Sequence, residues 1–149
     1  MISAGQKVNK LMQDFFTAYF NERDYKAAAG FLREDIRWIG LGAVCSARDR
    51  SEAVKFLQAE IAAAPYAVFF EYENVQNVML SETAAVFLCD LLLKKNKDGY
   101  DSDISIRVMA ACNCCDSVWK IAALHVSQAN MGPETGDFFP AAFSMEKVA

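Results

Sequence analysis

The chain has 149 residues, a mass of 16.5 kDa, a net charge of −4 and a pI near 5.0. This length suits one domain, and a composition that is 54% hydrophobic and 12% aromatic excludes global disorder. The acidic balance, without a basic stripe, argues against nucleic acid as a partner, and no apolar run is long enough to span a bilayer. The five cysteines and the absence of an apolar secretion segment predict a cytoplasmic protein with free thiols.

The N-terminal third of the chain predicts two helices. Apolar residues recur at helical spacing from Val8 to Tyr19, the strongest periodic signal in the sequence. The segment "NERD" breaks this pattern, and Asp24 is a suitable N-cap for a short second helix over Tyr25–Leu32.

Two short strands and a third helix follow. Alternation in "EDIRWIG" predicts a strand, Gly40 and Gly42 mark a turn, and "AVCS" predicts a second short strand. Asp49 with Glu52 three residues later predicts a capping box, which opens a helix that Pro65 ends.

Four long runs rich in β-branched and aromatic residues occupy the rest, up to Asn130. They are "YAVFFEYENVQNVML", "TAAVFLCDLLLKK", "SDISIRVMAACN" and "SVWKIAALHVSQA", separated by short turn segments of which Asp98-Gly99 is the clearest. Helices followed by consecutive strands predict an α+β domain whose antiparallel sheet is covered by helices on one face. We expect a single domain over 1–149, with a core at about 6–130 and an irregular tail at 131–149.

The three clustered cysteines, Cys112, Cys114 and Cys115, raise the question of a metal site. Zinc requires ligands at spacings that let four of them converge, whereas this run is C-x-C-C and the chain has one histidine. The prediction is therefore no metal and no cofactor, with small apolar side chains packed near a hairpin turn. Cys45 and Cys89, inside predicted strands, are assigned to the core.

Two stretches carry a family resemblance. "FFTAYFNERDYKAAAGFLREDIRWIG" resembles the opening of the nuclear transport factor 2-like superfamily, and "SVWKIAALHVS" resembles the last strand of its SnoaL-like domains. A similar ending occurs in the association domain of calcium/calmodulin-dependent protein kinase II, and "GDFFP" is similar to bacterial members that accompany signalling modules. The resemblance implies a cone-shaped, cystatin-like fold, with three N-terminal helices on a strongly curved, mainly antiparallel sheet that encloses a pocket.

The resemblance does not extend to ketosteroid isomerase chemistry. That enzyme's base is an aspartate at the end of the first strand, whereas the matching "RWIGLG" has no carboxylate. The tyrosine of its first helix falls on or near Phe16, one turn before Tyr19.

Four residues are the candidate pocket contacts. Strand alternation places His125 on one face with Trp119 and Ile121, and the fold's pocket makes that histidine a candidate polar contact or acid–base group. Arg107, at a comparable distance from the turn on the preceding strand, offers a guanidinium to an anion, as arginines do in the kinase association domain. The alternative is an arginine with its head in water. Tyr19 and Trp38 are predicted to form walls of the pocket, and the alternative for each is an ordinary position in the hydrophobic core.

The favoured function is a small-molecule-binding or sensory domain without turnover, for a partly apolar ligand that can be anionic. An alternative is an isomerase, cyclase or dehydratase that uses His125 as acid or base. A second alternative is a homo-oligomerising association module. The resemblance also implies a homodimer through the outer face of the sheet and an association with a signalling domain. Charge and composition exclude nucleic acid and membrane as expected partners.

Overall fold

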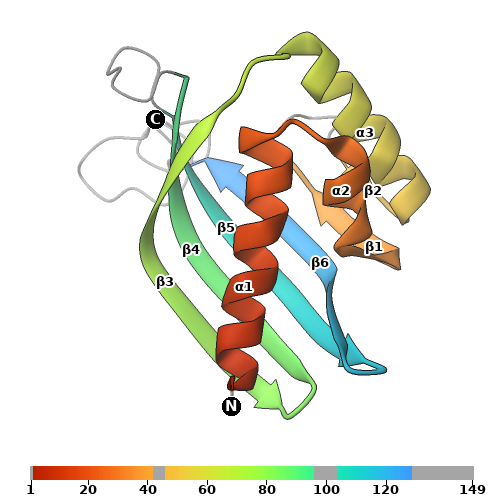
Figure 1. The fold of residues 1–149 in the computed structure, drawn as a ribbon, viewed down its shortest axis with the longest axis vertical. Coiled ribbons are helices and arrows are strands. Elements are labelled where there is room, and N and C mark those ends of the chain that lie inside the picture. The colour runs from red at the N-terminus through yellow and green to blue at the C-terminus, as the bar shows by residue number, and fades with distance from the viewer. Residues whose placement is uncertain (1, 42–45, 96–103, 129–149) are drawn as a thin grey trace, which may run out of the picture.

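The computed structural model describes residues 2–41, 46–95 and 104–128. These residues form one six-stranded sheet, in the order β2-β1-β6-β5-β4-β3, with the helices packed on one face (Figure 1). The strands are β1 (Leu32–Ile39), β2 (Ser46–Ala47), β3 (Phe69–Ser81), β4 (Ala84–Lys94), β5 (Ile104–Cys115) and β6 (Val118–Gln128). β1 and β6 are parallel, and the other neighbouring pairs are antiparallel. The predicted α+β class and curved, mainly antiparallel sheet are confirmed.

The helical layer also follows the sequence pattern. α1 (Ala4–Phe16) buries the predicted apolar stripe and continues into a π-helical turn, η1 (Thr17–Asn21); α2 (Tyr25–Gly30) and α3 (Arg50–Ala63) complete the layer. α2 is shorter than predicted because the chain is already extended at Leu32, the first residue of β1. α3 ends before Pro65, as predicted.

The caps of α2 and α3 are local features that the sequence indicates well. The Asp24 carboxylate accepts from the Ala27 amide at 3.0 Å, and that of Asp49 accepts from the Glu52 amide at 2.8 Å. The capping box at α3 is only half formed, because the Glu52 side chain accepts from the Arg48 amide at 3.0 Å rather than from that of Asp49.

The β5–β6 hairpin turns at the predicted "CCD" segment. Asp116 and Ser117 have φ values of 52° and 66°, as a two-residue turn with positive φ at both central positions requires. The predicted Asp98-Gly99 turn, Gly42, residues 43–45 of "AVCS" with Cys45, and the tail at 131–149 lie outside the described residues.

A β-bulge in β6 changes which side chains face the helices. Ala122 has no partner on β5, because its two neighbours pair with consecutive residues of that strand. The side-chain alternation therefore shifts by one residue at this point. Ile121 is buried before the bulge and Leu124 is buried after it, three residues later instead of two or four.

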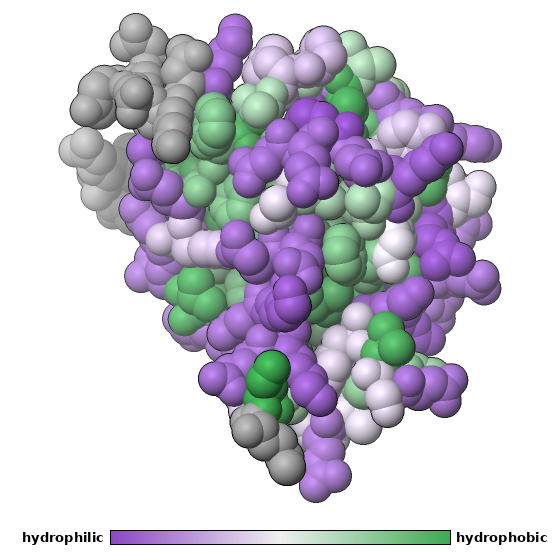
Figure 2. Space-filling model, in the orientation of Figure 1, coloured by the Kyte–Doolittle hydropathy of each residue, from purple (hydrophilic) through white to green (hydrophobic). Residues whose placement is uncertain are grey.

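The core lies between the helices and the inner face of the sheet, meaning the face that the helices cover. Its largest fully buried side chains come from both layers and include Phe15, Phe16, Leu57, Phe87 and Leu91. The solvent side of the helical layer is mostly hydrophilic, with hydrophobic side chains visible between its elements (Figure 2). None of the described helices combines the length and the hydrophobicity needed to cross a membrane.

Candidate ligand-binding cavity

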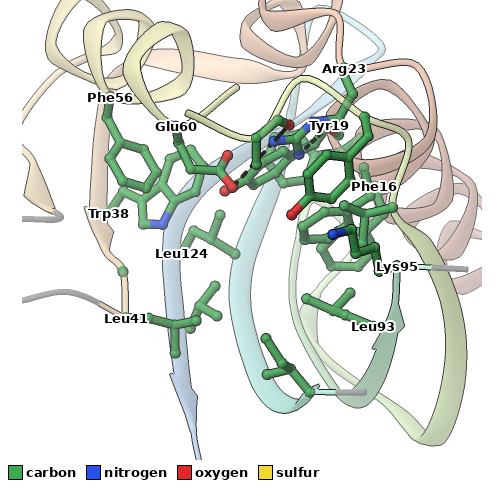
Figure 3. Close-up of a pocket in the computed structure, with 18 residues that line it drawn as sticks. Phe16, Tyr19, Arg23, Trp38, Leu41, Phe56, Glu60, Leu93, Lys95 and Leu124 are labelled. Atoms are coloured by element: carbon green, nitrogen blue, oxygen red, sulfur yellow. Dashed lines mark hydrogen bonds and ion pairs between the residues drawn. The ribbon is translucent and has the colours of Figure 1, made fainter. Parts of the chain in front are cut away.

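A cavity of about 360 Å³ opens at the end of the domain where β1, β4 and β6 finish and β3 begins. Its walls come from the end of α1 with η1, from α3 and from the inner face of the sheet (Figure 3). Leu124 and Val126 form the β6 side, on the inner face beyond the bulge. Because these segments are far apart in the sequence, the cavity exists only in the folded chain.

Aromatic side chains form most of the wall near the helices. Trp38 stands at the centre, with its ring 5.1 Å from that of Phe56 and 5.9 Å from those of Phe15 and Tyr19, all edge-on. The Tyr19 and Phe20 rings stack at 4.3 Å, both contributed by the π-helical turn. Edge-to-face rings at such distances are mutually attractive and hold the wall in a defined shape.

One arginine is buried in this wall. The Arg23 side chain is 6% exposed and donates to the Tyr19 carbonyl at 3.2 Å and to the Ala64 carbonyl at 2.9 Å. Its third contact is the Glu60 carboxylate at 3.5 Å. Arg23 thus ties the end of the first helical segment to the end of α3. Its backbone has a φ of 54°, a conformation that non-glycine residues adopt at a cost and that is often retained at functional sites.

Three polar atoms of the wall are buried without a hydrogen-bond partner among the described residues. They are Arg23 Nε, Glu60 Oε2 and Trp38 Nε1. Leaving such groups unpaired costs about 1–3 kcal/mol each in a folded protein, so native structures contain few of them. Their presence in one cavity wall indicates a surface that a bound molecule could complete.

The structure brings together only two of the four predicted contacts. Tyr19 and Trp38 both line the cavity, and their role in binding stays a prediction. Arg107 and His125 are exposed on the outer face of the sheet, away from the helices. The prediction that they line the pocket is therefore wrong in geometry.

The bulge at Ala122 is the physical reason for the error at His125. Unbroken alternation from Ile121 would have turned His125 inward, whereas the extra residue turns Leu124 and Val126 inward instead. His125 pairs with the exposed Met109 on β5.

Arg107 points outward because β5 alternates without interruption in this region. Its neighbours Ile106 and Val108 are buried, so the side chain between them faces solvent, as the alternative reading of this arginine described. Arg107 pairs with Ser127 and His125 with Met109, so the two side chains lie on one face in adjacent rows of neighbouring strands, as the hairpin geometry suggested.

Arg23 and Glu60 form the ion pair of the cavity wall, and sequence reasoning missed both, as it missed Lys95 and Tyr66. Arg23 lies in the "NERD" segment, which signals only a helix break, and Glu60 follows Phe56 by one helical turn on a face of α3 that carries no clear apolar stripe. The signal available was an arginine in a helix break. Nothing in the sequence links it to a glutamate 37 positions later.

The cysteines that the structure describes differ in burial. Cys89 and Cys112 are buried, and burial raises the pKa of each thiol to about 12. Cys114 is half-buried near the β5–β6 turn and Cys115 is exposed there. Within the described part of the chain, no group of three or more His, Cys, Asp and Glu side chains is placed to hold a metal ion.

Known structures of this architecture have diverse functions. A nuclear transport factor 2-like protein of unknown function from Pseudomonas putida has a TM-score of 0.76 at 14% identity, over 92% of this chain and 95% of that one. The hexachlorocyclohexane dehydrochlorinase LinA-type3 from Novosphingobium barchaimii has a TM-score of 0.71 at 16% identity, over 92% of this chain and 94% of that one. A proposed calcium/calmodulin-dependent protein kinase II association domain from Xanthomonas campestris has a TM-score of 0.72 at 15% identity, over 88% of this chain and 91% of that one. These similarities establish the cystatin-like fold and no activity.

The sequence itself identifies the family. No match was found among the curated proteins. The model of the SnoaL-like domain matches residues 8–131, which spans all the described helices and strands except the first residues of α1. The chain belongs to the SnoaL-like domain family.

Proposed function

We propose that this domain binds a small, mainly apolar, ring-containing molecule in the aromatic cavity, without turning it over. The observation that carries the proposal is the cavity itself, with its aromatic walls and a partly buried ion pair between Arg23 and Glu60. Mostly apolar pockets with a few convergent polar groups are the usual form of small-molecule sites.

The described lining favours binding over turnover. It contains no histidine, and its one carboxylate, Glu60, is engaged by a buried guanidinium. General acid–base catalysis works best with a group whose pKa lies near the working pH, and His125 is on the wrong face of the sheet to provide one.

Trp38 provides a reporter for the test. The variant Trp119→Phe leaves Trp38 as the only tryptophan, and its side chain is 2% exposed in the cavity wall. We expect 2-methoxynaphthalene to change its fluorescence in a saturable way.

A matched pair of substitutions on β6 locates the site. Val126→Phe, which fills the cavity from the inner face, should abolish the fluorescence change, whereas Ser127→Phe on the outer face should leave it intact. Saturable binding that survives Val126→Phe would contradict the proposal.

A second candidate function is an enzyme of the isomerase, cyclase or dehydratase type. The observation in its favour is the unpaired Oε2 of Glu60 in the cavity wall, together with the similarity to a dehydrochlorinase. Native mass spectrometry of molecules that co-purify with the chain, followed by incubation and mass analysis, separates the two. Ligand recovered with unchanged mass and chromatographic retention supports binding. A product lighter by water or hydrogen halide, or one of equal mass with a different retention time, supports the enzyme.

We also propose that two copies of the chain pair through the outer face of the sheet. This face exposes apolar side chains, with Met109 at 52% and Val78 at 47% exposure, beside Arg107 on β5 and the acidic Glu71 and Glu73 on β3. Opposite charges on one face are suited to a two-fold arrangement, in which each group of one copy meets its complement on the other. Analytical ultracentrifugation should show a dimer that Met109→Glu dissociates. An association with a signalling domain remains a separate prediction.

A further inference from the structure

The buried polar groups of the cavity wall are concentrated on one side. Glu60 extends from α3 toward Arg23 and lies between the Trp38–Phe56 rings and the Tyr19 ring (Figure 3). The opposite side is formed by aliphatic side chains of the sheet, including Leu93, Leu124 and Val126. A ring-containing ligand would therefore place its apolar body against the sheet and any polar substituent against Glu60.

The guanidinium of Arg23 is already paired with acceptors of the protein itself. Two carbonyl oxygens and the Glu60 carboxylate accept from its guanidinium, and only Nε lacks a partner. A ligand carboxylate at this wall would compete with Glu60 for the guanidinium and would lie next to a like charge, which is unfavourable at low solvent exposure.

Lys95 does not offset this disadvantage for an anion. It lies on the other flank of the cavity, with its ammonium 4.8 Å from the centre of the Tyr66 ring, and it is exposed, so solvent screens its charge. A ligand ammonium group is disfavoured as well, because the Glu60 carboxylate is already paired with the positive charge of Arg23.

A neutral hydroxyl fits the unpaired atoms. It can donate to a carboxylate oxygen and accept from an N–H group, which are the two kinds of unpaired atom in the wall, whereas a carboxylate or an ether can only accept. The Glu60 side chain retains 36% exposure although Oε2 itself is buried, so a ligand hydroxyl would reach this oxygen by displacing the side chain slightly from its place in the wall.

We infer that Glu60 selects the ligand, and that the ligand is a neutral, ring-containing molecule with a hydroxyl group that donates to the Glu60 carboxylate. This inference rests on the proposed binding function and adds to it the chemical class of the ligand. Glu60 acts here as a specificity-determining residue, with Arg23 holding it in place.

Three naphthalene derivatives of the same ring size test the inference on the Trp119→Phe protein. 2-Naphthol carries a donor, 2-methoxynaphthalene has the same oxygen without the donor, and 2-naphthoate is an anion at neutral pH. We expect 2-naphthol to bind roughly tenfold or more tightly than either of the others, as a hydrogen bond to a charged acceptor implies.

The variant Glu60→Gln then removes the charge while keeping the size of the side chain. The preference for 2-naphthol should shrink to about threefold or less, and 2-naphthoate should bind more tightly because Arg23 loses its counter-charge. Glu52→Gln is the matched control, since it removes another Arg–Glu pair from the same helix outside the cavity. It should leave the order of the three affinities unchanged.

The outcomes distinguish this inference from the function on which it rests. Equal binding of 2-naphthol and its methyl ether, or tightest binding of 2-naphthoate, overturns the hydroxyl inference and leaves small-molecule binding in place. Failure of all three to bind overturns both. Should Glu60→Gln fold poorly, the affinities of the three molecules for the Trp119→Phe protein still decide whether the site prefers a hydroxyl donor.

Discussion

The two faces of the sheet are built from the same strands but differ in what covers them. The inner face is covered by helices and forms the core and the cavity, whereas the outer face carries the exposed Arg107, Met109 and His125. A residue's chemistry does not reveal which face it occupies. The lone histidine and a mid-strand arginine suggested a site, but the polar pair in the cavity is Arg23 and Glu60, one in a helix break and the other on a helix. The comparison shows that the alternation of side chains along each strand, including its shift at a bulge, decides which strand residues face the cavity and can contact a ligand.

Deleting Ala122 and Ala123 together should have the largest effect on this division. With both residues gone, Leu124 follows Ile121 directly, so alternation would turn Leu124 outward and His125 inward, and this one-residue shift exchanges the two faces beyond that point. Deleting Ala122 alone is the matched control, because it removes the bulge and keeps Leu124 on the inner face. Losing the burial of Leu124 alone costs about 2–5 kcal/mol, so we expect the free energy of unfolding to fall by about 4 kcal/mol or more. Urea denaturation followed by circular dichroism measures it. A loss below about 1 kcal/mol for the double deletion would show that the number of residues between Ile121 and Leu124 does not set which side chains face the helices.

Two adjacent leucines of β4 test the division without changing the register. Leu91→Ala removes a fully buried side chain of the inner face and should cost about 3 kcal/mol, through lost burial and the cavity left behind. Leu92→Ala, on the outer face, should cost about 1 kcal/mol or less. The difference between their urea midpoints is the measurement, and equal costs would indicate that a partner covers the outer face under the conditions used.

The two arginines offer the same contrast for charged side chains. Arg23→Ala leaves the Tyr19 and Ala64 carbonyls and the Glu60 carboxylate without their donor, and should lower the free energy of unfolding by about 2 kcal/mol. The partial exposure of Glu60 keeps this below the cost of breaking a fully buried pair. Arg107→Ala should change stability by about 0.5 kcal/mol or less. A larger effect from Arg107→Ala than from Arg23→Ala would reverse the assignment of the two faces.

The cysteines predict how stability depends on alkaline pH. Burial raises the pKa of Cys112 to about 12, so this thiol stays neutral in the folded chain at a pH where it ionises in the unfolded chain. A raised pKa contributes stability that is complete below the unfolded-state pKa of 9.0 and is lost as pH rises from 9 toward 12. At pH 10 the loss relative to pH 8 should be about 1 kcal/mol per buried thiol.

Substituting a buried and an exposed cysteine separately isolates the loss of stability that ionisation of the buried thiol causes. Cys112→Ala should flatten the fall in the urea midpoint between pH 8 and 10, and Cys115→Ala, at the exposed hairpin end, should leave it as it is. The same slope in both variants would show that other groups, such as Tyr72, whose pKa burial also raises, dominate the alkaline response.

Sequence reasoning predicted the site less well than the fold, and the reason is visible at particular residues. Tyr19 and Trp38 were found because each continues a strong local period, a helical stripe in one case and strand alternation in the other. Glu60 and Arg23 were missed because their pairing depends on where α3 ends relative to η1, a distance that no local pattern encodes. His125 was misplaced because a bulge leaves no distinct signal in "KIAALHV", where alanines fit either face.

The amino-acid sequence by itself determined the class of the fold, the order of its elements, the N-caps at Asp24 and Asp49 and the tight turn before β6. These depend on hydrophobic period and on local hydrogen bonding, both of which act over a few residues. Only the tertiary structure decided which strand residues face the helices, that Arg23 and Glu60 meet, and that three polar atoms of their wall have no partner among the described residues. The phase beyond a bulge and the contact between distant segments are fixed by packing the layers together, because only the assembled core distinguishes the inside of the sheet from the outside.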